Sequence, residues 1–97
     1  MNKLETAFSQ YLDLLKLAGK IVEWKFNMIR LGLGGGAWYK PDFMVVWKDG
    51  YVTMYETKGH WREAARVRIK VAAGIHTWCE FVAVTRPKKD WVFEAIG

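Results

Sequence analysis

The chain has 97 residues, of which 52% are hydrophobic and 6 are Trp, and this composition predicts one folded domain over 1–97 rather than a disordered chain. Its 15 Lys and Arg against 10 Asp and Glu give a net charge of +5, which favours phosphate-rich partners. The single cysteine, Cys79, excludes an internal disulfide, and no apolar stretch is long enough to cross a bilayer. We therefore expect a soluble cytoplasmic protein with no membrane partner.

The first part of the chain predicts a helix, a strand and a loop. Apolar residues recur at helical spacing over 3–18, and Gly19 stands where a helix ends. Residues 21–29 alternate between apolar and polar side chains, which predicts a strand whose buried face carries Val22, Trp24, Phe26 and Met28. The glycine-rich segment 32–36 predicts a flexible loop. It lacks the Lys-Ser/Thr pair and the following helix of a phosphate-binding loop.

The second part predicts a hairpin, a helix and a further strand. Residues 42–47 and 51–58 form the hairpin, and 61–73 form a helix that ends at Gly74. Residues 80–85 are almost continuously apolar, as expected of a strand covered on both faces. The tail after 89 is either a short helix or an edge segment. The order α-β-β-β-α-β predicts an α/β fold, with a mixed sheet of about four strands flanked by helices.

The turn at 48–50 leaves two hairpin registers open. A two-residue Asp-Gly loop would place Asp42 opposite Thr57. A three-residue loop, with Gly50 in the left-handed region, would place Asp42 opposite Glu56. We favour the second register because it collects the Val and Met side chains of both strands on one face.

In the favoured register, charged residues end a face that is expected to be buried. Asp42 faces Glu56, and Lys58 lies two residues further along the same face. Two carboxylates this close raise each other's pKa unless a positive charge separates them. A divalent cation, which prefers hard oxygen ligands, would do so. The alternative is that Glu56 and Lys58 are hydrated residues at the end of a strand.

These residues carry a resemblance to a known family. Pro41-Asp42, followed about a dozen residues later by Glu56-Thr57-Lys58, resembles the PD-(D/E)XK nuclease superfamily. The longer pattern YKPDF…YETKGHW, followed by a basic helix, is more similar to the phage endonuclease I group of Holliday-junction resolvases. The resemblance implies a restriction-endonuclease-like core and hydrolysis of DNA phosphodiester bonds with Mg²⁺, or Mn²⁺ in its place. It also implies branched DNA as substrate, a homodimer and, for a phage-encoded chain, the host cytoplasm.

The resemblance assigns roles residue by residue. The family carries a glutamate on the helix before the sheet, and Glu5 in KLETAF matches it. The metal ligands implied are therefore Glu5, Asp42, Glu56 and the main-chain carbonyl of Thr57, and Lys58 is the catalytic lysine. The alternative for Glu5 is an acid favoured by the dipole at a helix N-terminus. Only four residues precede Glu5, whereas these resolvases have an N-terminal arm, so we expect any dimer to form through other surfaces.

A basic stripe on the second helix is the predicted DNA contact. Arg62, Arg66 and Lys70 recur every four residues, with Arg68 beside them. Lys88, Lys89 and His60 are secondary candidates. The alternative is a solvated helix face.

Several functions stay open at this point. The first is a structure-specific endonuclease, and the next is a less selective DNA nickase or restriction-like nuclease on the same fold. A non-catalytic DNA-binding protein is a further alternative, which the intact acids and lysine disfavour. A structural or packaging protein would leave the acids of the buried face without a reason.

Overall fold

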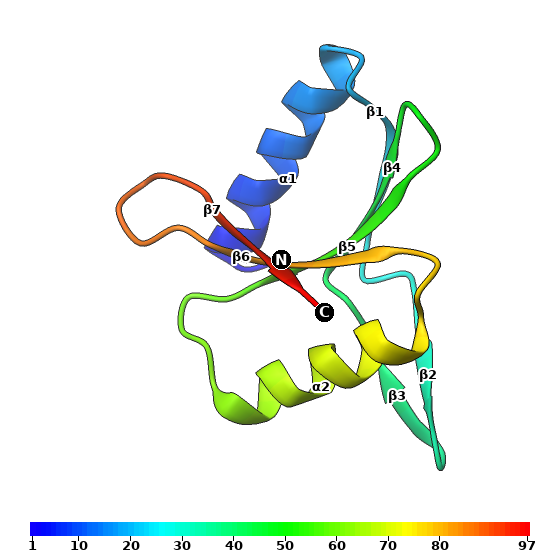
Figure 1. Ribbon diagram of the computed structural model, residues 1–97. Helices are drawn as coiled ribbons and strands as arrows, with labels where there is room; N and C mark the ends of the chain where they lie inside the picture. Colours follow the sequence, from blue (N-terminus) through cyan, green and yellow to red (C-terminus); the bar gives the residue numbers. More distant parts are fainter.

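Two helices and seven strands make up the fold, which a computed structural model describes for all of residues 1–97 (Figure 1). The helices are α1 (Lys3–Leu17) and α2 (Glu63–Ile75). The strands are β1 (Ile21–Phe26), β2 (Leu31–Gly34), β3 (Ala37–Tyr39), β4 (Phe43–Trp47), β5 (Val52–Thr57), β6 (Glu80–Thr85) and β7 (Val92–Ile96). Neither helix is both long and apolar enough to cross a membrane.

The main sheet has five strands in the order β1-β4-β5-β6-β7, and β2 pairs with β3 in a separate small sheet. All neighbours are antiparallel except β5 and β6, which run parallel and are connected through α2. The predicted α/β fold with a mixed sheet flanked by helices is therefore confirmed. The main sheet has one strand more than the four expected, because the tail of the chain forms the edge strand β7.

Each face of the main sheet is covered by one helix, and Figure 1 shows α1 and α2 on opposite sides of it. On one side α1 contributes Phe8 and Leu12 to a core with Phe43, Val45, Tyr55 and Val84. On the other side α2 contributes Ile69 and Ala72 to a core with Met54, Phe81, Ala83 and Ile96. Neighbouring strand residues enter different cores because strand side chains alternate between faces. The burial expected for the Val and Met face is only partly confirmed, because Met54 is buried while Met44, Val46 and Val52 are half-buried. The opposite face of the hairpin is the more buried one, with Phe43, Val45, Thr53 and Tyr55.

The hairpin of β4 and β5 has the register with the three-residue loop. Met44 pairs with Met54 and Val46 with Val52. The N–H of Gly50 donates to the carbonyl of Trp47 at 2.9 Å, and Gly50 has a φ of 93°, a left-handed conformation that favours glycine. The pairing of the two strands thus runs toward Asp42 and Glu56 at the end opposite the turn.

The helix ends are predicted correctly for α1 and incorrectly for α2. Helix α1 ends at Leu17, and Gly19 follows with a φ of 75°, as a helix-terminating glycine does. Helix α2 begins at Glu63 rather than at Trp61 and continues through Gly74 to Ile75. Glycine lowers the stability of a helix by only about 1 kcal/mol, so packing of α2 against the sheet determines where the helix ends.

The burial expected for β1 is partly wrong. The pairing of β1 with β4 shifts between Ile21 and Glu23, and this bulge brings Ile21 into the core on the α1 side. Val22 is exposed as a result. The strand ends at Phe26, where Asn27 adopts a φ of 55°, so Met28 lies outside it and is exposed.

The glycine-rich segment is not a flexible loop but the tip of the hairpin that β2 and β3 form. Gly34, Gly35 and Gly36 have φ values of 90°, 58° and 80°, which residues with a Cβ rarely adopt. Leu31 and Tyr39 anchor the two strands in the core beside α2. The hairpin therefore lies against α2, where it forms part of the site described next.

Candidate active site

Three of the predicted site residues, Asp42, Glu56 and Lys58, lie together at the carboxyl end of β5. The N–H of Lys58 donates to the carbonyl of Val84 at 3.0 Å, which extends the pairing with β6 beyond the strand. The N–H of Asn27 donates to the carbonyl of Asp42 at 2.8 Å, which ties the end of β1 to the start of β4. Backbone hydrogen bonds of the sheet thus hold both Asp42 and Lys58 in place.

Glu56 is a carboxylate in the core region of the protein. Its side chain is on the α2 side and only 8% of the residue is exposed. Oε1 accepts a hydrogen bond from the Tyr39 hydroxyl at 2.9 Å, and Oε2 lies 3.3 Å from Nζ of Lys58. Burial, together with the negative charge of Asp42, raises the pKa of Glu56 despite these two donors. The site therefore holds a carboxylate that binds protons more readily than one in water.

Asp42 is turned toward the residue that follows Glu56. Its Oδ2 accepts from the N–H of Thr57 at 2.9 Å and from the Thr57 hydroxyl at 3.0 Å. Burial raises the pKa of Asp42, and the charge of Glu5 raises it further. The two bonds from Thr57 and the charge of Lys58 lower it, so the net shift is upward. The Thr57 side chain thus has a structural role that the sequence did not indicate.

Glu5 has the position that its alternative interpretation predicts. It is in the first turn of α1, where its carboxylate accepts from the N–H of Asn2 at 2.8 Å. The N–H of Glu5 donates to Oδ1 of Asn2 at 2.7 Å, which completes a capping box. Its charge nevertheless acts on Asp42.

The donor set for a divalent cation contains the neighbouring carboxylates of Asp42 and Glu56. No group of three or more His, Cys, Asp or Glu side chains is arranged to hold a metal ion. Asp42 and Glu56 offer hard carboxylate oxygens, which Mg²⁺ prefers, and burial raises the pKa of both carboxyl groups. Glu5, the third predicted ligand, is hydrogen-bonded to Asn2 in the capping box, and its charge also reaches Asp42.

The predicted DNA-binding residues divide into separate groups. Arg62 and Arg68 line a hollow of about 460 Å³ that Glu56 and Lys58 also line. Arg66 instead makes a bidentate pair with Glu94 of β7, at 2.9 and 3.1 Å, and its guanidinium lies 5.4 Å from the ring centroid of Trp61. The four-residue stripe is therefore not one uniform surface.

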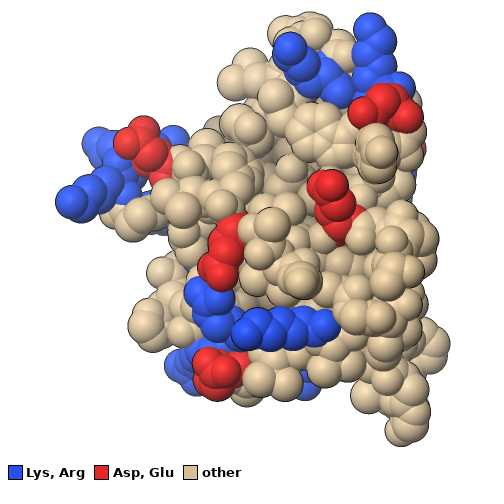
Figure 2. All heavy atoms as spheres, in the orientation of Figure 1, with Lys and Arg blue, Asp and Glu red and all other residues tan.

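The remaining basic candidates lie on loops. Lys88 and Lys89 are exposed in the turn between β6 and β7, and His60 is exposed before α2. Figure 2 shows basic side chains gathered on this projecting turn and over α2. Because β5 and β6 are parallel, the turn that follows β6 lies at the same end of the strands as Lys58, which follows β5. The hydrogen bonds from Arg66 lower the pKa of Glu94, and the charge of Lys70, which is exposed on α2, adds to this shift.

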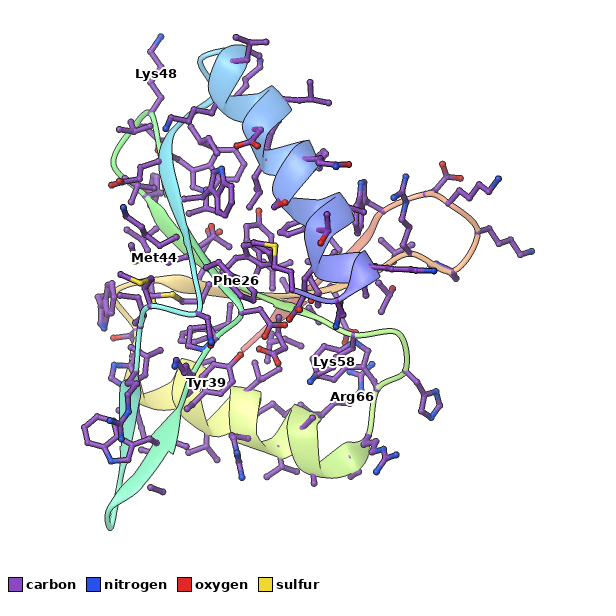
Figure 3. The ribbon with its side chains drawn as sticks, turned by 180° about the vertical axis from the view of Figure 1, so that it is seen from behind. Phe26, Tyr39, Met44, Lys48, Lys58 and Arg66 are labelled. Atoms are coloured by element: carbon purple, nitrogen blue, oxygen red, sulfur yellow. The ribbon has the colours of Figure 1, made fainter.

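Tyr39 is the site residue that sequence reasoning missed. It is buried, lies at the end of β3 and donates its hydroxyl to Glu56. In Figure 3 Tyr39 lies between the sheet and α2, and Lys58 lies at the same end of the molecule. Tyr39 is the first residue of YKPDF and lies three residues before Asp42, so the motif contained it. Because a loop was expected at 32–36, strand β3, which positions Tyr39, was not predicted.

Comparison with known proteins found no counterpart: no protein-family model, curated protein or solved structure matches this chain.

Proposed function

We propose that this chain is a Mg²⁺-dependent DNA endonuclease of the PD-(D/E)XK type that cuts branched DNA such as Holliday junctions. It would be of the type that phages and prophages encode. The observation that carries the proposal is the buried Glu56, which has Asp42 as a charged neighbour, Lys58 as an ion-pair partner and a hollow with basic walls beside it. Burial of a carboxylate opposes folding unless it is fully compensated. Such groups, with raised pKa values and a nearby lysine, concentrate at functional sites.

The roles divide among the residues at the carboxyl end of β5. Asp42 and Glu56, with the main-chain carbonyl of Thr57, would hold Mg²⁺. A bound Mg²⁺ supplies an acidified water and charge stabilisation for phosphodiester hydrolysis. The Lys58 ammonium, which lies 3.3 Å from Glu56 Oε2, would stabilise the negative charge that develops on the phosphate. Tyr39 keeps Glu56 in place through its hydroxyl.

DNA would be held by the basic residues around this end of the sheet. Arg62 and Arg68 stand closest, since they line the same hollow as Glu56. The outer contacts would be Arg66, Lys70, Lys88, Lys89 and His60. A homodimer would supply two such sites, which two symmetric cuts in a four-way junction require.

A second candidate is a non-catalytic DNA-binding protein on the same fold. It is favoured by the internal partners of the acids: Thr57 donates to Asp42, while Tyr39 and Lys58 contact Glu56. Under this alternative the charges would stabilise one another and the basic surface alone would act. A nuclease with little preference for branched DNA is the remaining variant of the first proposal.

Cleavage of labelled DNA separates these candidates. A four-way junction, a linear duplex and a single strand are incubated with the protein in Mg²⁺ and in chelator. We expect cutting in Mg²⁺ only, preferentially of the junction. Glu56→Gln should abolish cutting and leave junction binding largely intact. Glu23→Gln, which removes an exposed carboxylate paired with Lys25 on β1, is the matched control and should cut normally. No cutting of any DNA by folded protein would support the non-catalytic candidate instead.

A further inference from the structure

The hollow beside Glu56 has more positive charge than the cleavage site uses. It lies between β3, the end of β5 and α2, and its charged lining consists of Glu56, Lys40, Lys58, Arg62 and Arg68. Lys58 pairs with Glu56, whereas Lys40, Arg62 and Arg68 take part in no ion pair. Three uncompensated cations around one hollow favour an anionic ligand.

The N-terminus of α2 lies at the same hollow. Its N-cap, Arg62, makes no side-chain capping bond, and the first helical N–H to reach the Arg62 carbonyl is that of Ala65. Ala64 and Ala65 line the hollow with small side chains, so a ligand can approach the helix closely. An uncapped helix N-terminus with nearby cations is a favourable environment for a phosphate.

An aromatic ring forms a further wall. Trp38 of β3 lines the hollow and is 52% exposed. The Arg30 guanidinium lies over the ring, 4.6 Å from its centroid, so a base that stacks on that face takes the place of the guanidinium. A Cβ added at Gly32 on the paired strand would come within 3.7 Å of the ring. The ring therefore rests against the β2–β3 hairpin, and an exposed tryptophan beside cations is suited to stack on a nucleobase.

We infer that this hollow holds one unpaired nucleotide of the DNA strand that is cut, with its phosphate near Arg62, Arg68 and Lys40 and its base against Trp38. The inference deepens the proposed function and rests on it for the identity of the ligand as DNA. A volume of about 460 Å³ lies within the range of small-ligand pockets and suits one nucleotide. A base can stack on a protein ring only when it leaves its own duplex, so the hollow selects single-stranded or branched regions.

The test measures binding without cleavage. Full-length protein in chelator is titrated into a short fluorescent single strand and into a duplex of the same sequence, with anisotropy as the readout. Trp38→Ala should weaken single-strand binding by about tenfold and change duplex binding by less than about twofold. Trp38→Phe should restore most of the loss because it keeps an aromatic face. Trp78→Ala, which removes another exposed tryptophan, outside the hollow, is the control and should change neither.

A second pair of variants tests the phosphate contact. Arg68→Ala should weaken single-strand binding and reduce its dependence on salt. Lys48→Ala, which removes a cation from the opposite end of the molecule (Figure 3), should do neither. Thermal melting of every variant verifies that it is folded. If Trp38→Ala does not fold, Trp38→Phe still provides a folded variant at this position.

Two results would overturn the inference: single-strand affinity of folded Trp38→Ala within about twofold of the parent chain, or an equal loss on duplex. These outcomes are separable from those of the cleavage test. Normal cutting with no effect of Trp38→Ala would retain the nuclease and reject the nucleotide site. Selective loss of strand binding in a protein that never cuts DNA would do the reverse.

Discussion

The hairpin of β4 and β5 has a hollow at each end, and the two hollows differ in charge and burial. At the turn lies the larger one, about 810 Å³, whose charged lining is two bases and two acids, all exposed: Lys20, Lys48, Asp49 and Glu80. At the other end lies the smaller one, about 460 Å³, with four bases against a single, buried acid. Ordinary hydrated surface explains the first arrangement, because balanced exposed charges need no further partner.

Charge and burial, rather than volume, therefore distinguish the end of the molecule at which we propose the active site. Water hydrates the side chains of the larger hollow, so they impose little constraint on the fold. Glu56 is instead held out of water beside Asp42, which opposes folding. A region that lowers stability in this way is expected where function requires it.

The largest expected effect is on cleavage. Asp42→Asn and Lys58→Met should each reduce the single-turnover cleavage rate of a labelled junction by about a thousandfold, because each removes a charge from the proposed centre. The matched substitutions at the other hollow, Asp49→Asn and Lys48→Met, should leave the rate unchanged. Similar losses at both ends would place the chemistry elsewhere.

Mg²⁺ should stabilise the folded protein by binding at the proposed site of Asp42 and Glu56. At about 100 times its dissociation constant, an ion that binds only the native state adds about 2.7 kcal/mol, which is about 10 °C in melting temperature for a domain of this size. Thermal melting of the parent chain and of Glu56→Gln, each with and without Mg²⁺, measures the effect. Only the parent chain should respond, and an equal rise in both proteins would argue against Glu56 as a ligand.

Tyr39→Phe should destabilise the fold by about 2 kcal/mol, because the buried Glu56 carboxylate loses a hydrogen-bond donor. Chemical denaturation measures the free energy of unfolding. Tyr51→Phe is the control, since Tyr51 lines the larger hollow and is 66% exposed, and it should change stability little. Equal effects of both substitutions would show that the Tyr39 hydroxyl has no special partner.

The stability contributed by Glu56 and Asp42 should fall as the pH rises. Folding raises the pKa of both Glu56 and Asp42 above their ordinary values near 4, so the folded state binds protons more strongly than the unfolded state. Stability contributed by these groups is therefore lost as the pH rises from the ordinary pKa through the raised one. Melting temperatures across this range should fall less steeply for Glu56→Gln than for the parent chain. An identical slope would contradict the raised pKa of Glu56.

The smallest effect is expected at Arg66. Its pair with Glu94 is at the surface and screened by water, so Arg66→Ala should change the free energy of unfolding little. It should also weaken DNA binding less than Arg68→Ala, because Arg66 already has a carboxylate partner and Arg68 has none. Filter binding or anisotropy at several salt concentrations compares the two. A larger loss of DNA affinity for Arg66→Ala than for Arg68→Ala would support the original prediction that the basic residues of α2 form one DNA-binding surface.

The features that the sequence predicted correctly are those set by local rules. The turn left two hairpin registers open, and the collection of Val and Met side chains on one face selected the one that the structure has. That register also predicted the end of the hairpin where Asp42, Glu56 and Lys58 lie. The continuous apolar run of β6 and the helical spacing of α1 were likewise decided by the residues themselves.

The features that were missed depend on packing between distant segments. A glycine run is compatible with both a loop and a hairpin tip, and the choice depends on how Leu31 and Tyr39 pack beside α2. Spacing of four residues predicts a stripe on α2 but not its rotation against the sheet. That rotation places Arg66 against Glu94 of β7, a strand that the tail residues did not specify by themselves.

The parallel pairing of β5 and β6 also has a consequence for the order of folding. Residues 43–57 can pair as a hairpin early, because the closing turn is short. Burial of Glu56 requires α2 and then β6, whose pairing closes a loop of more than twenty residues. The carboxylate is therefore expected to stay hydrated in the transition state and to lose its water only as the chain completes the sheet. Removing its charge should then slow unfolding far more than it speeds folding.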